Sequence, residues 1–294
     1  MRSSAWWLWP GVAVIVLGMA LARAHVEFAA QNLTPLCWTG FILAVDGLLA
    51  RRGASWLRNS PRELALMAAI SIPSWALFEL YDRPRFWAAG GPELWWHYAG
   101  LPPWPWRGLG YAWAFATITP AVLLLAELIE PAARRHAGPG AGGRTPREVE
   151  WLLMVAGGVM AALPLLWPSP YFAADVWLAW PLLLDPLNHR RGRPSVIGDL
   201  ERGRRSRPLA LLASGLGCGV LWEGWNWLAS SRWSYTVPFL GGVKLYEMPV
   251  LGFLGFAPFA LAVFALYHFA RGLLPGAPPT DEAQGAARRE PAWN

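Results

Sequence analysis

Charge is scarce in this sequence, and cysteine is scarcer still. Only 15% of the 294 residues are charged, whereas 55% are hydrophobic. This composition, with the apolar residues gathered in long blocks, excludes an ordinary water-soluble globular domain. The two cysteines, Cys37 and Cys218, lie inside different apolar runs with no CxxC motif or histidine cluster beside them. Their positions argue against a disulfide framework and against a zinc site.

The sequence is rich in apolar runs long enough to cross a hydrocarbon layer about 30 Å thick. Eight such runs cover residues 6–22, 34–50, 64–81, 109–129, 151–167, 171–187, 208–228 and 249–271. We therefore expect an all-α integral membrane protein with eight transmembrane helices. A cleaved signal peptide is an alternative for the first run, because Arg2 precedes it and small residues stand at 22 and 24. The repeat described below favours retention of this run.

The basic residues are distributed unevenly between the two sets of loops. Of the 25 Lys and Arg residues, 19 fall at the termini and in the loops that share their side, and 6 fall in the opposite loops. This asymmetry predicts that both termini are cytoplasmic in a bacterial inner membrane. Basic residues beside membrane spans favour contact with anionic lipid headgroups. No nucleic-acid-binding motif is present, so membrane lipids are the expected partners and nucleic acid is not.

The motif D-x-L-x-x-R-R-G occurs twice, at Asp46–Gly53 and at Asp185–Gly192. The similarity continues for about 90 residues after each copy, which predicts an internal repeat. We expect a first four-span repeat at 1–130, a basic Gly-rich cytoplasmic linker at 131–150 and a second four-span repeat at 151–271, followed by a disordered tail at 272–294. Four spans return the chain to its starting side, so the two repeats have the same orientation and are related by an axis along the membrane normal.

The two copies of the motif have an architectural interpretation. Each aspartate lies about one helical turn from the expected membrane edge, where it can pair with an arginine of the following pair. We therefore expect Asp46 to pair with Arg51 and Asp185 with Arg190. The glycine that closes each motif suits the end of a helix.

Three glutamates near the outer ends of spans are the candidate catalytic residues. Glu79 and Glu223 occupy corresponding positions in the two repeats, and Glu247 opens the last span. A charged group at membrane depth is costly, by at least roughly 2.5 kcal/mol on insertion scales, so such groups are functional candidates. The alternative is that Glu79 and Glu223 only link helices through hydrogen bonds. The sequence leaves both interpretations open.

Aromatic residues surround the glutamates of the second repeat. We expect Trp222, Trp225, Asn226, Trp233 and Tyr235 to bind a substrate. Protonation of a carbon–carbon double bond by a buried acid gives a carbocation, which aromatic faces stabilise. No metal, nucleotide or phosphate motif is present, so no cofactor is expected. The expected partner is a hydrophobic small molecule dissolved in the bilayer.

These motifs resemble a known family. Trp222-Glu223, then Trp233-x-Tyr235 and then Glu247 before a proline are similar to the membrane-embedded lycopene cyclase domain. The resemblance implies cofactor-independent acid–base cyclisation of a linear carotenoid, although the paired-acid P-x-E-E element of that family is absent. The whole chain more closely resembles a family of uncharacterised bacterial multi-pass proteins that carry LLDPLN, WEGWNW and YEMPVLGFLGF.

Three hypotheses for the function follow. The first is an isoprenoid- or carotenoid-modifying enzyme, with Glu223 and Glu247 as proton donor and acceptor. The second is a transporter or lipid-binding membrane module with a site between the repeats, which would use Glu79 and Glu223 equally. The third is a structural partner protein. The sequence leaves the substrate and the oligomeric state open.

Overall fold

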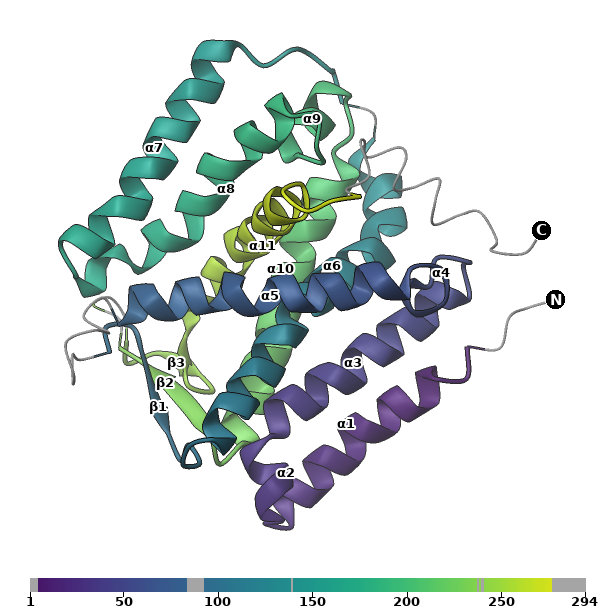
Figure 1. Ribbon diagram of the computed structural model, residues 1–294, viewed down its shortest axis with the longest axis vertical. Helices are drawn as coiled ribbons and strands as arrows, with labels where there is room; N and C mark the ends of the chain where they lie inside the picture. The colour runs from purple at the N-terminus through teal and green to yellow at the C-terminus, as the bar shows by residue number, and fades with distance from the viewer. Residues whose placement is uncertain (1–4, 84–92, 139, 237, 239–240, 277–294) are drawn as a thin grey trace.

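The structure is a computed structural model, which describes residues 5–83, 93–138, 140–236, 238 and 241–276. The chain is mostly helical (Figure 1). The helices are α1 (Leu8–Arg23), α2 (Glu27–Gln31), α3 (Leu33–Ala50), α4 (Trp56–Asn59), α5 (Pro61–Asp82), α6 (Trp106–Ala137), α7 (Arg147–Leu166), α8 (Ala173–Arg190), α9 (Val196–Glu201), α10 (Ser206–Leu228) and α11 (Phe256–Arg271), with 3-10 turns η1 (Pro170–Phe172) and η2 (Val250–Gly255). The strands are β1 (Trp96–Ala99), β2 (Arg232–Tyr235), β3 (Lys244–Leu245) and β4 (Met248–Pro249).

Each of the eight predicted apolar runs overlaps one of the long helices. Among the described residues, five helical segments are long and apolar enough to cross a membrane, namely α3, α5, α6, α7 and the segment formed by η2 and α11. Helix α1 is apolar but only 16 residues long. The other two, α8 and α10, carry more polar residues, such as Asp175 and Asp185 in α8. The apolar helices indicate a membrane-embedded protein, with five spans supported by length and composition.

Two helix pairs lie at opposite edges of the molecule. Figure 1 shows α1 beside α3 at one edge and α7 beside α8 at the other, with α5, α6, α10 and α11 between them. The edge helices expose large apolar side chains, including Val16 of α1 and Val155 of α7. In water such a surface would be unfavourable, whereas hydrocarbon tolerates it, so these edges suit contact with lipid.

Glycine lets the helices of each edge pair approach closely. A Cβ added to Gly11 of α1 would lie 2.6 Å from the carbonyl oxygen of Gly40 in α3. A Cβ added to Gly157 of α7 would lie 2.7 Å from the carbonyl oxygen of Ala179 in α8. Ala179 follows Gly40 by 139 residues, the same interval that separates the two D-x-L-x-x-R-R-G motifs. Small residues at membrane helix contacts allow this packing.

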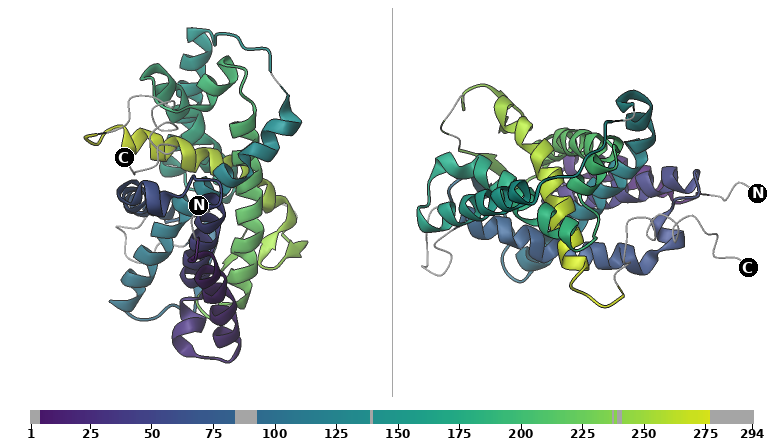
Figure 2. Two further views of the ribbon diagram at one scale, coloured as in Figure 1. Left: turned by 90° about the vertical axis from the view of Figure 1, so that its right-hand side faces the viewer. Right: turned by 90° about the horizontal axis from the view of Figure 1, so that it is seen from above.

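The main contacts among the other long helices also occur in corresponding pairs. Within the first 137 residues α3 packs on α6 and α5 on α6, and in the second half α8 packs on α11 and α10 on α11. Across the middle, α6 packs on α10 and α5 on α11. Figure 2 shows the same central helices from two further directions.

The two short strands β1 and β2 were not anticipated from the sequence. They pair antiparallel, with Trp96 opposite Tyr235 and Tyr98 opposite Trp233. When the two halves of the sequence are aligned, the W-x-Y of β1 matches the W-x-Y of β2. In the strand pair, each tryptophan lies opposite the tyrosine of the other strand. A second pair, β3 and β4, lies just before η2. The fold is therefore helical with two small strand pairs rather than entirely helical.

The repeated motif forms the same turn in both places, but with partners that differ from the expected arginines. Asp46 accepts hydrogen bonds from the backbone amides of Trp56 and Leu57 at 2.6 and 3.3 Å. Asp185 accepts them from Val196 and Ile197 at 2.7 and 2.9 Å. Each aspartate thus holds the first turn of the short helix that follows, α4 or α9, whose free amides need acceptors.

The arginines of the motif lie elsewhere. Arg190 lies 3.7 Å from Glu150 of α7, and Arg51 is exposed at the end of α3. The glycines Gly53 and Gly192 adopt φ of +74° and +66°, as expected for residues that end a helix. The expected pairs Asp46–Arg51 and Asp185–Arg190 are therefore corrected: backbone amides bind these buried carboxylates, whereas Arg190 lies against Glu150 and Arg51 is exposed.

The predicted linker at 131–150 begins as a helix, and its residues after the helix are hydrogen-bonded to the rest of the protein. Helix α6 continues to Ala137, beyond the predicted end of the span at 129. The amides of Gly140 and Gly143 then donate to the carbonyls of Gly203 and Glu201. Thr145 donates its amide hydrogen to the Glu201 carboxylate at 2.6 Å. Most of the predicted disordered tail, 277–294, lies outside the described residues.

Candidate functional site

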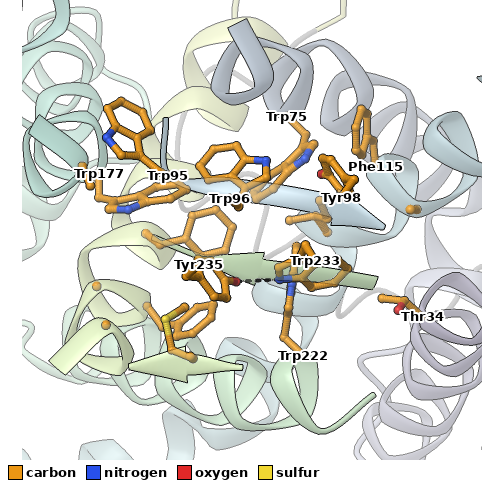
Figure 3. A pocket seen from close by; sticks show the side chains of 18 of the residues that line it. Thr34, Trp75, Trp95, Trp96, Tyr98, Phe115, Trp177, Trp222, Trp233 and Tyr235 are labelled. Atoms are coloured by element: carbon orange, nitrogen blue, oxygen red, sulfur yellow. Dashed lines mark hydrogen bonds between the residues drawn. The ribbon is translucent and has the colours of Figure 1, made fainter. Parts of the chain in front are cut away.

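A pocket of about 530 Å³ lies between the two halves of the chain. Its wall is formed by β1 and β2 together with the ends of α3, α6, α8 and α11 that face the strands. Figure 3 shows aromatic side chains converging on this space from several elements. The labelled aromatic residues are Trp75, Trp95, Trp96, Tyr98, Phe115, Trp177, Trp222, Trp233 and Tyr235.

The aromatic rings of the wall contact one another directly. The ring centroids of Trp75 and Trp222 are 5.2 Å apart, and those of Trp177 and Phe259 are 5.3 Å apart. Trp75 and Trp177 are stacked, with centroids 6.3 Å apart. Contacts of this kind are favourable and hold the rings in fixed orientations. The pocket is therefore a preformed apolar space bounded by ring faces and edges.

Glu223 lies behind this wall. Its side chain is fully buried in α10, as the sequence analysis expected. The hydroxyl of Tyr235 donates to Glu223 Oε1 at 2.7 Å, and Trp233 Nε1 donates to that hydroxyl at 2.7 Å. Glu223 Oε2 has no hydrogen-bond partner among the described residues. Tyr235 lines the pocket and Glu223 does not, so the tyrosine stands between the acid and the space.

Glu79 has an equivalent arrangement in the first half. The hydroxyl of Tyr98 donates to Glu79 Oε1 at 2.6 Å, and Trp75 Nε1 donates to the same oxygen at 3.0 Å. Tyr98 and Trp75 line the pocket, whereas Glu79 does not. Each half thus contributes a tyrosine at the pocket surface with a glutamate directly behind it.

The two tyrosines remain protonated. Burial, followed by the charge and the hydrogen bond of Glu79, raises the pKa of Tyr98 well above its ordinary value. Burial and Glu223 act in the same way on the pKa of Tyr235. A phenol with a raised pKa donates a hydrogen bond and does not ionise near neutral pH. Both groups therefore place hydroxyls, not phenolates, at the pocket.

Glu247 stands apart from the other two glutamates. It lies in the loop between β3 and β4, partly exposed, and its carboxylate is 3.9 Å from Arg232. The following residues Met248 and Pro249 line the pocket, but Glu247 does not. Among the described residues that line the pocket there is no aspartate or glutamate. The three candidate catalytic acids do not meet in a common space, although two of them reach it through tyrosines.

The five predicted substrate-binding residues separate into two groups. Trp222, Trp233 and Tyr235 line the pocket. Trp225 and Asn226 are buried outside it. The Asn226 amide donates to the Trp233 carbonyl at 2.7 Å and accepts from the Trp233 amide at 2.9 Å. Asn226 therefore holds β2 in place rather than facing the pocket.

Several lining residues were missed because they come from other elements. Trp38 of α3 and Trp177 of α8 are separated by 139 residues, so the repeat interval was a signal that could have found them. Their contacts also correspond. The ring centroids of Trp38 and Trp222 are 5.8 Å apart, and those of Trp177 and Phe78 are 4.8 Å apart. Trp222 directly precedes Glu223 in the sequence, and Phe78 directly precedes Glu79. Thr34 and Arg107 also line the pocket, and no sequence motif pointed to them.

The described part of the chain contains no group of three or more His, Cys, Asp or Glu residues placed to hold a metal ion.

No protein-family model matches this sequence, and no curated protein and no solved structure matches it. The site must therefore be interpreted from its own geometry.

Proposed function

We propose that this protein binds a lipid-soluble, largely apolar small molecule in the aromatic pocket between its two halves. The observation that supports this proposal is the pocket itself: about 530 Å³ of space, walled by contacting aromatic rings, with no acidic residue in the described wall. Small-molecule sites typically have volumes of roughly 300–1,000 Å³ and mostly apolar walls. Because lipid chains are as apolar as the wall, selectivity has to come from shape and from contact with ring faces, which favours an unsaturated or planar molecule.

The proposal includes the two-repeat organisation and eight membrane crossings. It is supported by the corresponding glycine contacts at the two edges, by the shared turn of the two D-x-L-x-x-R-R-G motifs and by the W-x-Y register of β1 and β2. Two equal halves that enclose a site are common among membrane transporters and binding modules. On this interpretation Glu79 with Tyr98 and Glu223 with Tyr235 are equivalent parts of one site.

An acid–base enzyme of isoprenoid or carotenoid modification is the second candidate. It is favoured by the two hydroxyls at the pocket surface, each hydrogen-bonded to a glutamate. A protonated glutamate could pass its proton through the tyrosine to a substrate double bond while the other pair removes a proton, so that the net reaction is an isomerisation without a cofactor. The aromatic faces would stabilise the intermediate cation.

Ligand binding can be measured by energy transfer from the pocket tryptophans to a conjugated polyene. The purified protein in lipid nanodiscs is titrated with retinol, whose absorption overlaps tryptophan emission. We expect saturable quenching that Ala114→Phe weakens, because Ala114 lines the pocket and a phenyl group would occupy part of it. The matched control is Ala112→Phe on the same helix, since Ala112 is outside the lining. Equal quenching in both variants would contradict the proposal.

Catalysis is tested separately by expression in a host that accumulates lycopene. The enzyme candidate predicts a cyclised or isomerised product, detected by chromatography, that Glu223→Gln reduces strongly. If lycopene stays unchanged while binding in nanodiscs is saturable, carotenoid cyclisation is excluded and the function as a binding module is supported. If both Glu79→Gln and Glu223→Gln impair the activity equally, the two halves act as equivalents.

The proposed orientation, with both termini on the cytoplasmic side of a bacterial inner membrane, has its own test. Reporter fusions after residues 57 and 197 should be active only as cytoplasmic reporters, because both positions follow the basic motifs. A fusion after residue 100 should be active only as a periplasmic reporter.

A further inference from the structure

The pocket is built from corresponding elements, but its two ends differ in chemistry. The α3 end presents Gln31, Asn32 and Thr34 to the pocket. The residues 139 positions later, at the α8 end, are Pro170, Tyr171 and Ala173. Two amides and a hydroxyl in one half therefore correspond to a proline, a phenol and a methyl group in the other. The α3 end thus carries two amides that the α8 end lacks.

A single positive charge lies at the α3 end. Arg107, in the first turn of α6, is the only charged residue among the described residues that line the pocket. Its Nε donates to the carbonyl of Pro102 at 3.0 Å, which holds the side chain in place. The structure shows no bond from the other two guanidinium nitrogens to a described residue. A tethered guanidinium with two free nitrogens presents a fork suited to a carboxylate or phosphate.

A buried hydroxyl at the same end also lacks a partner. Thr34 is only 7% exposed, and its Oγ1 has no hydrogen-bond partner among the described residues. Buried polar groups are nearly always hydrogen-bonded, so this hydroxyl is an exception, although its oxygen has almost no exposed surface. Figure 3 shows Thr34 on one side of the pocket, with Trp177 on the other.

We propose that the ligand is an amphiphile with one anionic head, a carboxylate or phosphate, bound by Arg107, and an apolar tail directed between the tryptophans toward α8 and α11. This inference rests on the proposed binding function and adds the chemical class and the orientation of the molecule. The described lining contains no acid to oppose a negative head. At the other end, Ala173, Leu251 and Leu254 suit a hydrocarbon tail.

The test compares two probes that differ only in the charge of the head. Protein in zwitterionic nanodiscs is titrated with cis-parinaric acid and with its methyl ester, and energy transfer from tryptophan to the tetraene reports binding. We expect the acid to bind on the order of tenfold more tightly than the ester, as one charge-assisted contact provides. Arg107→Gln should remove this preference, because binding of the acid should weaken to the level of the ester.

Two further variants keep the result interpretable. Arg107→Lys retains the charge without the fork and should keep part of the preference. Lys244→Gln removes an exposed positive charge from β3, outside the pocket lining, and should leave the preference intact. Elution volume and helical content are compared for all variants, and saturable binding of the ester by each variant shows that the pocket is still formed.

Competition identifies the source of the anionic head. Displacement of the acid by farnesyl phosphate but not by inorganic phosphate indicates a head attached to a single chain. Displacement by dioleoyl phosphatidic acid indicates a membrane lipid instead, which also supports an anionic amphiphile. Equal binding of acid and ester, or a preference that survives Arg107→Gln, would overturn the inference while the apolar pocket stands. Binding of neither probe or retinol would count against the proposed function itself.

Discussion

Tyr235 donates its hydroxyl hydrogen to Oε1 of Glu223 over 2.7 Å, at the boundary between the pocket and the buried side of α10. Tyr98 and Glu79 form the corresponding pair in the other half. In both cases the aromatic residue comes from a strand and the acid from a helix. The β1–β2 pair therefore connects the two acids to one space.

Removal of the Tyr235 hydroxyl should destabilise the fold as well as alter the site. Tyr235→Phe leaves both carboxylate oxygens of Glu223 without a side-chain partner among the described residues. We expect the free energy of unfolding to fall by about 1–3 kcal/mol, the usual cost of an unsatisfied buried group. The measurement is a denaturant titration in detergent, followed by circular dichroism.

The control for that variant is Tyr246→Phe, because Tyr246 is exposed and the structure shows no hydrogen bond from its hydroxyl. Combining Tyr235→Phe with Glu223→Gln should cost less than the sum of the two single changes, since they remove the same interaction. Additive costs would show that the two residues are not coupled.

The edge pair α7–α8 offers a test with adjacent residues. Gly157→Leu should destabilise the protein by about 1–3 kcal/mol, because a Cβ at this position already lies 2.5 Å from the Leu183 amide nitrogen. Gly158→Leu should have little effect, because nothing lies within 4 Å of its Cβ position. Thermal unfolding in detergent compares the two variants. Similar losses in the two variants would show that the close contact at Gly157 does not decide the result, since leucine favours a helix more than glycine does.

Asp185, the aspartate of the second motif, should stabilise the fold through the backbone amides that donate to it. Asp185→Ala leaves the Val196 and Ile197 amides without their acceptor, and we expect a loss of about 1–3 kcal/mol. Asp175→Ala, in the same helix, removes a carboxylate for which the structure shows no hydrogen bond, and should cost less than about 1 kcal/mol. If Arg190→Gln were as damaging as Asp185→Ala, an ion pair would have to replace this explanation.

The hydrogen bond between Thr145 of the linker and the Glu201 carboxylate predicts that the stability of the fold depends on pH. Burial acts to raise the pKa of Glu201, but hydrogen bonding by Thr145 and the nearby charge of His189 outweigh it, so the pKa is lowered from 4.5. A lowered pKa means that the carboxylate stabilises the fold above about pH 4.5 and that this contribution is lost as the pH falls through the folded-state value.

The comparison is between the native protein and Glu201→Gln. The variant should unfold at a lower temperature at pH 7, and the two melting temperatures should approach each other as the pH is lowered to 3. A difference that stays constant over this range would show that the charge of Glu201 is not involved.

Local patterns in the sequence were enough to predict where the long helices lie and that Glu223 is buried. The apolar runs predicted where each long helix lies, because run length and composition are properties of the segment itself. Glu223 is fully buried, as expected for the buried acid of a membrane-embedded site. The extended length of α6 was missed, since polar residues at a membrane edge give no clear stop signal.

The two copies of the D-x-L-x-x-R-R-G motif were visible in the sequence, but the hydrogen bonds of their aspartates were not. Asp46 and Arg51 are near in sequence, which suggested an ion pair, yet the chain turns back and brings the Trp56 amide to the carboxylate instead. A turn with a positive-φ glycine changes which groups meet, and only the folded backbone shows the outcome.

The sequence alone determined that this is an apolar, mostly helical protein in which one eight-residue motif occurs twice and acids lie near the ends of apolar runs. Only the tertiary structure decided which side chains meet in the pocket, because its wall combines Trp38, Trp177 and Trp222 from three distant segments. It also decided that Glu247 stays outside, and that tyrosines separate Glu79 and Glu223 from the space. Proximity between distant segments depends on how helices pack, and packing depends on contacts summed over the whole chain.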